Sequence, residues 1–266
     1  MAEKRKRQRK RQATIAVALV VGVIGAGVAF AGFLGGGKAQ TRASGTPTPP
    51  VSPTAAPSTV TPSPGPATVA CGAKAPKDAT TPKPQFSAAP PMQIDTSKTY
   101  LATFKTSCGS IVVELLASQA PQTANSFVFL AEKGYFDGTR FHRLATSIDV
   151  IQGGDPTGTG SGGPGYSIPD ELTGKGSYGP GVLAMANAGP NTGGSQFFII
   201  TGPKGHKLNA NPNYTIFGQV VKGLDVAKRI QNLSIQDPQA AAQGDIAGQQ
   251  PKDAVYIESI TITVKK

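Results

Sequence analysis

The chain has 266 residues and a formal net charge of +11, a balance that would suit a nucleic-acid binder. The charge is not evenly spread, however. Residues 1–12 carry seven Lys or Arg and one Glu, whereas residues 92–266 carry 14 Lys or Arg and 13 Asp or Glu. Because the larger part is nearly neutral, it lacks the basic surface that phosphate binding needs, and we expect no nucleic-acid partner.

Residues 13–34 follow this basic tail and form a run of 22 residues without a charge. A helix of that length spans roughly 33 Å and matches the hydrocarbon core of a membrane. The basic residues 1–12 predict a cytoplasmic tail, and everything after residue 34 would then lie outside the cytoplasm. We expect a transmembrane signal-anchor and a single-pass protein of the cell membrane. The alternative is a secreted protein, since Ala29–Phe30–Ala31 fits the pattern that precedes a signal-peptide cleavage site.

Residues 35–91 are rich in Pro and Thr and hold 13 of the 23 prolines but only one aromatic residue, Phe86. Such a segment cannot bury enough apolar area to offset the entropy of ordering it, so we predict a disordered linker. Cys71 lies in this linker, and Cys108 falls at the tip of a predicted hairpin. An oxidising compartment would permit a disulfide between the two, which would tie the linker to the domain; the alternative is two unpaired thiols. Two cysteines and two distant histidines do not predict a metal site.

The sequence becomes typical of a folded domain from about residue 92. Residues 99–106 and 110–116 are rich in strand formers and are separated by a hairpin signal. Residues 120–135 predict a helix, with Pro121 in its first turn and Gly134 after its end. A second helix is predicted near residues 225–232. The remaining strand-like runs are 141–144, 150–152, 182–186, 196–201, 215–221 and 254–264. About eight strands with two helices predict an all-β-dominated fold, a closed barrel without exposed sheet edges.

The glycine run Gly158-x-Gly160-x-x-Gly163 formally matches a dinucleotide-binding fingerprint. That fingerprint requires a helix to begin within it, and the prolines on both sides of this run, Pro156 and Pro164, prevent one. A folded surface loop is therefore the better interpretation. The dipeptide His142–Arg143, taken alone, is also more typical of a structural than of a catalytic pair.

A second motif, "MANAGPNTGGSQFFIITG" at residues 185–202, changes the interpretation of His142–Arg143. Together with "FHR", "QGGD", "GTGSGGPGY" and "YTIFGQV", it resembles the cyclophilin family of peptidyl-prolyl cis–trans isomerases over roughly residues 97–264. The resemblance implies an eight-stranded antiparallel β-barrel capped by two helices. With the linker and the apolar run, the chain is similar to membrane-anchored bacterial forms that help exported proteins to fold. It implies no cofactor, proline-containing polypeptides as substrates, and a monomer.

The resemblance also implies the site residues, within a domain spanning residues 92–266. The catalytic arginine falls on Arg143, beside His142 and near Gln152, which we include in the catalytic set. The substrate-binding positions fall on Val150, Ala186, Asn187, Gln196, Phe198, Leu208 and Tyr214. A permanently charged arginine suits the reaction, because the prolyl nitrogen regains a lone pair when the amide twists.

Two features depart from the family pattern: the chain contains no Trp, and residue 149 is Asp. Counting back from Gln152, Asp149 falls where the family has a phenylalanine that lines the proline pocket. A carboxylate there would pair with Arg143 and weaken catalysis. The alternative function is thus a proline-binding or chaperone-like module with weak or no turnover. A loop that bulges and turns Asp149 to solvent would remove this concern.

Overall fold

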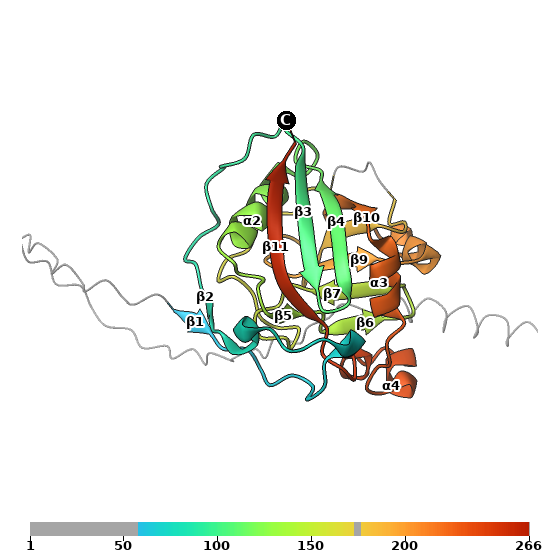
Figure 1. Ribbon diagram of the computed structural model, residues 1–266. Coiled ribbons are helices and arrows are strands. Elements are labelled where there is room, and N and C mark those ends of the chain that lie inside the picture. The colour runs from blue at the N-terminus through green and yellow to red at the C-terminus, as the bar shows by residue number, and fades with distance from the viewer. Residues whose placement is uncertain (1–57, 173–176, 266) are drawn as a thin grey trace, which may run out of the picture.

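The computed structural model describes residues 58–172 and 177–265 (Figure 1). The predicted cytoplasmic tail (1–12), the predicted membrane anchor (13–34) and the first part of the predicted linker lie outside the described residues.

One strongly curled antiparallel sheet of nine strands forms the body of the molecule. The strands follow the order β5-β11-β3-β4-β10-β8-β9-β7-β6 across the sheet. Their bounds are β3 Tyr100–Thr106, β4 Gly109–Leu115, β5 Thr139–Arg140, β6 Arg143–Ala145, β7 Val150–Gly153, β8 Val182–Met185, β9 Phe197–Ile200, β10 Ile216–Lys222 and β11 Tyr256–Val264. The predicted antiparallel β architecture is confirmed, but the fold is a half-barrel of nine strands.

The prediction of a closed barrel of eight strands is corrected at the corner between β5 and β6, the two edge strands. Only Phe141 and His142 separate these strands. The N–H of Phe141 donates to Val255 O, beside one edge, and the N–H of His142 donates to Gln152 O in β7, beside the other. Consecutive residues therefore bond near opposite edges of the sheet, and across this corner the described residues form the isolated bridge of Arg140 with Asp155 instead of a continuous ladder.

The hairpin of β3 and β4 agrees with its prediction. Its register runs from Tyr100 opposite Leu115 to Thr106 opposite Gly109, so Ser107 and Cys108 form the turn. The long strand β11 pairs with β3 along most of that strand's length. Strand β11, the last in the sequence, thus lies beside β3, which is the first strand of this sheet along the chain.

Both predicted helices are present. Helix α2, Pro121–Glu132, begins with a proline in its first turn and places Phe127 and Leu130 in the core. Helix α3, Leu224–Gln231, buries Val226 and Ile230 against the sheet. The two helices lie on opposite sides of the long strands in Figure 1. The described residues also contain a short helix that the sequence did not predict, α4 (Pro238–Ala242), which is capped at its N-terminus by the Asp237 side chain. The 3-10 helices are η1 Ala70–Gly72, η2 Lys77–Thr80, η3 Pro203–Ala210 and η4 Ala247–Gln249.

The strands β7, β8 and β9 are buried on both faces, and alternate side chains serve two different clusters. On β9, Phe197 and Ile199 join the main core together with residues from α2. Phe198 and Ile200 on the same strand point the other way and join a second cluster with Val150 and Tyr214. Because successive side chains of a strand alternate between faces, one strand supports both the core and the second cluster.

Residues 58–91 differ from the prediction of a disordered linker, because the structure describes them as a segment that packs on the domain; we call residues 58–91 the strap (Figure 1). The strap contains β1 Thr59–Val60, β2 Lys83–Pro84, η1 and η2. Phe86 packs its ring 5.1 Å from that of Phe129 on α2. The Lys83 side chain is 4% exposed and donates to Asp137 O. These contacts supply the burial that the strap's composition did not suggest.

The predicted disulfide between Cys71 and Cys108 is present, with Cα atoms 5.2 Å apart. It joins the strap to the turn of the β3–β4 hairpin. The domain that the sequence placed at residues 92–266 is therefore covalently tied to residues before that boundary.

The predicted localisation is corrected. A membrane-spanning helix needs about 20 predominantly apolar residues. Within residues 58–172 and 177–265, no helix is both long enough and apolar enough to cross a membrane. The run on which the prediction rested, residues 13–34, lies outside the described residues. The single-pass membrane protein, and the exported clients inferred from it, are accordingly not retained.

Candidate active site

Three neighbouring strands align the central polar and aromatic residues of the site. Arg143 on β6 lies opposite Gln152 on β7, and Gln152 lies opposite Phe198 on β9. Residues directly opposite one another in a sheet point to the same face. The three side chains therefore form a row on the face that carries the second cluster, away from the main core.

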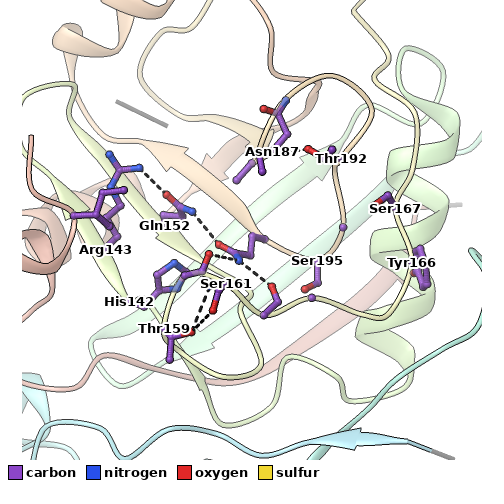
Figure 2. Close-up of a pocket in the computed structure, with 18 residues that line it drawn as sticks. His142, Arg143, Gln152, Thr159, Ser161, Tyr166, Ser167, Asn187, Thr192 and Ser195 are labelled. Atoms are coloured by element: carbon purple, nitrogen blue, oxygen red, sulfur yellow. Dashed lines mark hydrogen bonds between the residues drawn. The ribbon is translucent and has the colours of Figure 1, made fainter. Parts of the chain in front are cut away.

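A chain of side-chain hydrogen bonds runs from Arg143 (Figure 2). The Arg143 guanidinium donates from one terminal nitrogen to Gln152 Oε1 at 3.0 Å, and Gln152 Nε2 donates to Gln196 Oε1 at 3.0 Å. Gln196 Nε2 then donates to the carbonyl oxygens of Gly160 and Gly162, both at 2.9 Å. Since arginine can only donate, it fixes which end of each glutamine amide faces its neighbour.

The row borders a small pocket with largely apolar walls. Its lining residues are Arg143, Ile148, Val150, Gln152, Ala186, Phe198, Leu208 and Tyr214. The Phe198 and Tyr214 rings meet edge to face, with centroids 5.2 Å apart. Tyr214 is held in turn by Tyr178, whose hydroxyl donates to Tyr214 O and accepts from Tyr214 N. Apolar walls with Arg143 at the border suit a proline ring whose amide nitrogen must meet a donor.

A larger cavity of about 450 Å³ adjoins this pocket and shares Arg143, Gln152 and Ala186 with it. Figure 2 shows the residues that line it. The remaining sequence-predicted residues, His142, Asn187 and Gln196, line this larger cavity. The structure thus brings every predicted catalytic and substrate-binding residue to one of two adjoining hollows. The disulfide lies elsewhere, at the hairpin turn.

The glycine run forms the loop that the sequence predicted, on one side of the larger cavity. Asp155 is fully buried and accepts from Thr157 N at 2.7 Å and from Gly162 N at 3.2 Å. Burial opposes the charge of Asp155, but His142 and the Thr157 hydrogen bonds outweigh it and lower the pKa of this carboxyl group. Gly154 precedes the loop with φ +82°, and a Cβ there would lie 2.3 Å from Ser195 O. Only glycine allows this close approach.

His142 is 6% exposed and lies between the larger cavity and a neighbouring one of about 320 Å³. Within the described part of the chain, neither of its ring nitrogens has a hydrogen-bond partner. Burial lowers the pKa of His142 to about 4, so the ring is neutral at pH 7. A neutral ring facing the cavity suits a contact residue better than a source of positive charge.

Arg143 is itself 5% exposed, and burial lowers the pKa of its guanidinium. An arginine starts from so high a pKa that it stays charged at neutral pH. Burial raises the pKa of the nearby Tyr214 to about 12, so that phenol is neutral. The site therefore presents a desolvated cation beside neutral polar and aromatic groups.

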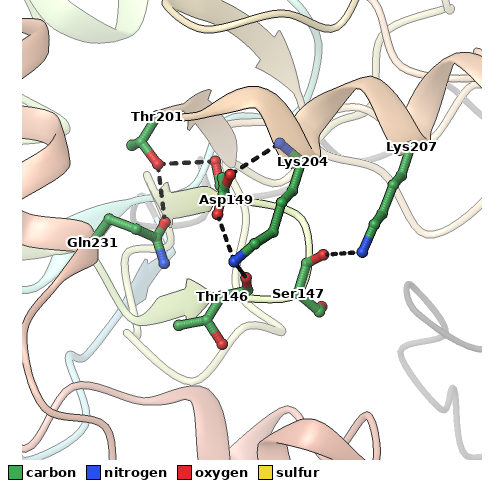
Figure 3. Close-up of polar contacts among 7 residues, drawn as sticks. All are labelled: Thr146, Ser147, Asp149, Thr201, Lys204, Lys207 and Gln231. Carbon is green, nitrogen blue, oxygen red and sulfur yellow. Dashed lines mark hydrogen bonds and ion pairs between the residues drawn. The ribbon is translucent and has the colours of Figure 1, made fainter.

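Asp149 does not lie in the pocket, and its predicted register is corrected (Figure 3). Its carboxylate accepts from Lys204 N at 2.9 Å and lies 3.3 Å from Lys204 Nζ. The residue has φ +50°, a left-handed conformation within the turn from β6 to β7. This turn sends the Asp149 side chain toward η3 and gives the preceding residue, Ile148, to the pocket wall.

The loop around Asp149 is joined to η3 by further hydrogen bonds. Lys204 Nζ donates to Thr146 O at 3.0 Å, and Lys207 Nζ donates to Ser147 O at 2.9 Å. Two walls of the small pocket, Ile148 on the loop and Leu208 on η3, are held together in this way. The sequence missed Ile148 because the turn shifts the alignment by one residue.

The larger cavity also contains several residues that the sequence motifs did not predict as site residues. Tyr166, Thr192, Ser195 and Ile246 line it. Of these, Ile246 comes from the segment before β11, where the sequence carries no motif that marks it. Among residues 58–172 and 177–265, no group of three His, Cys, Asp or Glu is placed to hold a metal ion.

Comparison with known proteins agrees with this geometry. The model of the family described as cyclophilin type peptidyl-prolyl cis-trans isomerase matches residues 101–262. The peptidyl-prolyl cis-trans isomerase ppi1 of Schizosaccharomyces pombe is 48% identical over 130 residues, which are 47% of this chain and 81% of that protein. The human peptidyl-prolyl cis-trans isomerase-like 1 is 44% identical over 149 residues, 54% of this chain and 86% of that protein.

Solved structures give the same result. The fold resembles a cyclophilin type peptidyl-prolyl cis-trans isomerase of Cryptosporidium parvum, with a TM-score of 0.54 and 32% identity over 63% of this chain and 99% of that chain. A structure of the Cryptosporidium protein in the presence of the dipeptide Ala-Pro has a TM-score of 0.53 and 34% identity, over 61% of this chain and 98% of that chain. These relatives are eukaryotic and give no support to the membrane-anchored bacterial form. The match over more than half of the sequence shows that this chain belongs to the cyclophilin-type peptidyl-prolyl cis–trans isomerase family.

Proposed function

We propose that this chain isomerises X–Pro peptide bonds with Arg143 as its electrostatic catalyst and with proline-containing polypeptides as substrates. The observation that carries the proposal is the row Arg143–Gln152–Phe198, which sets a held guanidinium beside an apolar pocket. The Ala-Pro dipeptide present with the Cryptosporidium relative supports proline as the group that enters the pocket.

Rotation about an X–Pro bond needs a hydrogen-bond donor more than it needs a nucleophile. The planar amide resists rotation with a barrier of about 18–20 kcal/mol, because the nitrogen lone pair is shared with the carbonyl. When the bond twists, the lone pair returns to the prolyl nitrogen, which then accepts a hydrogen bond. A donor at that nitrogen binds the twisted state more tightly than either planar state, so it lowers the barrier. Removing about 7 kcal/mol would accelerate isomerisation roughly 10⁵-fold.

The other residues have supporting roles in this proposal. Phe198, Val150 and Leu208 contact the ring, while Ile148 replaces Asp149 as a wall. Gln152 orients Arg143, and Gln196 ties that pair to the glycine loop. The larger cavity, with Asn187 and His142 in its lining, receives the residues next to the proline.

The alternative, a proline-binding or chaperone-like module with weak turnover, rested on a carboxylate in the pocket. Asp149 contacts Lys204 and does not line either hollow, so no observation favours this alternative.

The test is cis–trans exchange in an Ala-Pro-containing peptide, followed by NMR with the full chain and with Phe198→Ala. We expect the wild-type chain to accelerate exchange. Phe198→Ala should lower kcat/KM at least tenfold, on the order of the loss when a large aromatic wall is truncated. A folded wild-type chain that leaves the exchange rate at its uncatalysed value would refute the proposed function.

A further inference from the structure

A second glutamine holds the guanidinium of Arg143 from the side opposite the strand row. Arg143 Nε donates to Gln249 Oε1 at 2.8 Å. Gln249 is 3% exposed and lies in η4, 106 residues after Arg143 in the chain. The element η4 packs on β6, the strand that carries Arg143. No motif of the sequence marks this residue.

The orientation of the Gln249 amide is fixed at both ends. Gln249 Nε2 donates to Asp245 O at 3.2 Å, which leaves Oε1 for Arg143. Asp245 in turn accepts from Ala247 N at 3.0 Å, so the loop before η4 is also held. Arginine has only donors, and a reversed amide would set N–H groups against N–H groups. Both contacts therefore favour the same amide orientation.

The segment that presents Gln249 is tightly packed. Asp237 N donates to Gly248 O at 3.1 Å, and a Cβ on Gly248 would lie 2.7 Å from Asp237 O. The start and end of the segment are joined, because Gln236 N donates to Gln250 O and Lys252 N donates to Ser234 O, both at 2.8 Å. Residues 234–252 thus form a compact unit that presents Gln249 from a fixed position.

We propose that Gln249 is a positioning residue for the isomerase reaction, an inference that rests on the proposed role of Arg143. Gln152 holds one terminal nitrogen of the guanidinium and Gln249 holds Nε, so the plane of the group is fixed from two sides. Both acceptors are neutral amides, which orient the cation without cancelling its charge. In a desolvated site, that charge acts more strongly on the prolyl nitrogen than it would in water.

The first test compares Gln249→Met with Gln236→Met in the full chain. Methionine keeps the length of the side chain but cannot accept the hydrogen bond strongly. We expect Gln249→Met to lower kcat about tenfold with KM within about twofold, because the arginine is misplaced while the apolar walls stay intact. Gln236 is the matched control, since its side chain donates to Pro251 O in the same unit and lines neither of the two hollows of the site. Gln236→Met should keep kcat within about twofold of the wild type.

The second test uses the wild-type protein, so it does not depend on whether a Gln249 variant folds. In the wild-type protein, the Nε–H proton of Arg143 should give a slowly exchanging NMR signal with cross-peaks to the Gln249 side chain; Arg143→Lys assigns it. The inference fails if this signal exchanges rapidly, or if folded Gln249→Met keeps wild-type kcat. It also fails if both methionine variants lose kcat equally. An inactive wild-type chain would instead refute the proposed function, so the two failures are distinguishable.

Discussion

At the residue scale, the site is built around one buried cation and the neutral groups that hold it. Arg143 is 5% exposed, and its contacts with Gln152 and Gln249 are hydrogen bonds to amide oxygens. Burying a charge is costly unless it is hydrogen-bonded, so these glutamines stabilise the folded site as well as orient the donor. The low-dielectric surroundings that make the burial costly also strengthen the field at the substrate.

The buried His142 should make the stability of the folded protein depend on pH. Its pKa is about 4 in the folded protein because it is buried, with Asp155, Arg143 and Arg140 as the charged groups that act on it. In the unfolded chain the pKa of His142 is about 6.5, so between pH 4 and 6.5 the unfolded state binds more protons than the folded state. The free energy of unfolding should therefore fall as the pH decreases from 6.5 to 4, by about 3 kcal/mol from this group.

Urea unfolding at several pH values checks this prediction with His142→Leu as the comparison. Leucine has a similar size and does not titrate, so the variant should lose the part of the slope between pH 6.5 and 4. Asp155, whose pKa is lowered, should still destabilise both proteins at lower pH. Parallel pH profiles for the two proteins would show that His142 is not buried in its neutral form.

Substitution of Asp149 should lower the stability of the protein without impairing catalysis. Its carboxylate accepts from Lys204 N and pairs with Lys204 Nζ, so Asp149→Ala should lower the unfolding free energy by about 1 kcal/mol. Asp149→Asn keeps an acceptor and tolerates the left-handed backbone, so it should lose less. Both variants should keep kcat/KM within about threefold of the wild type, well short of the loss expected when a catalytic donor is removed. A several-fold gain in kcat/KM for Asp149→Phe would mean that the carboxylate lies in the pocket after all.

At the scale of the elements, the strap supports one wall of the larger cavity. Gln85 Nε2 donates to Gly163 O at 2.7 Å, and Phe86 N donates to Pro164 O at 2.8 Å. The Phe86 and Tyr166 rings lie 6.4 Å apart, and Tyr166 lines the cavity. Gln85 and Phe86, which precede the first isomerase motif by more than 50 residues, thus help to shape the proposed substrate site.

We therefore predict that Gln85→Ala weakens peptide binding. Loss of this hydrogen bond should raise KM about threefold to tenfold, since one bond contributes on the order of 1 kcal/mol, while kcat should change less. Gln93→Ala is a suitable control, because Gln93 is exposed and its side chain makes no hydrogen bond in the described part of the chain. Kinetics at several peptide concentrations separate KM from kcat. Equal KM values for the two variants would exclude a role for the strap in binding.

Much of the element pattern could be predicted from local sequence. The alternation in residues 254–264 matches β11, and Pro121 and Gly134 bound α2 as expected. The unpredicted elements lack such signals. Strand β5 has two residues, and η4 has three. The strap has the composition of a linker, and only its tertiary contacts, such as those of Phe86 and the disulfide, order it.

The site was predictable where it depends on motif and strand period, and not where it depends on distant contacts. Arg143, Gln152 and Phe198 follow from the family resemblance, and the strand register places them in one row. Ile148 was missed because a left-handed residue in the turn shifts the register. Gln249 was missed because its contact with Arg143 spans 106 residues.

At the scale of the whole molecule, the curled sheet gives the site and the core opposite faces of the same strands. Six phenylalanines fill the core, and the row from Arg143 to Phe198 lies on the other face. They are Phe104, Phe127, Phe136, Phe141, Phe197 and Phe217. The core thus fixes the backbone of β7 and β9, and these strands fix the donor and the apolar wall relative to each other. Rigid strands suit a reaction that depends on placing one donor within hydrogen-bond distance of one nitrogen.

The central claim is that Arg143 catalyses isomerisation by stabilising the twisted amide. The most direct test measures kcat/KM and peptide affinity for the wild type, Arg143→Ala and Arg143→Lys, with folding checked by thermal unfolding. Arg143→Ala should lose at least about 100-fold in kcat/KM, as when one transition-state donor is removed, while its peptide affinity changes only a few-fold. Arg143→Lys should recover little, because a flexible point charge does not replace the planar fork. A folded Arg143→Ala protein with near-wild-type kcat/KM would contradict the account.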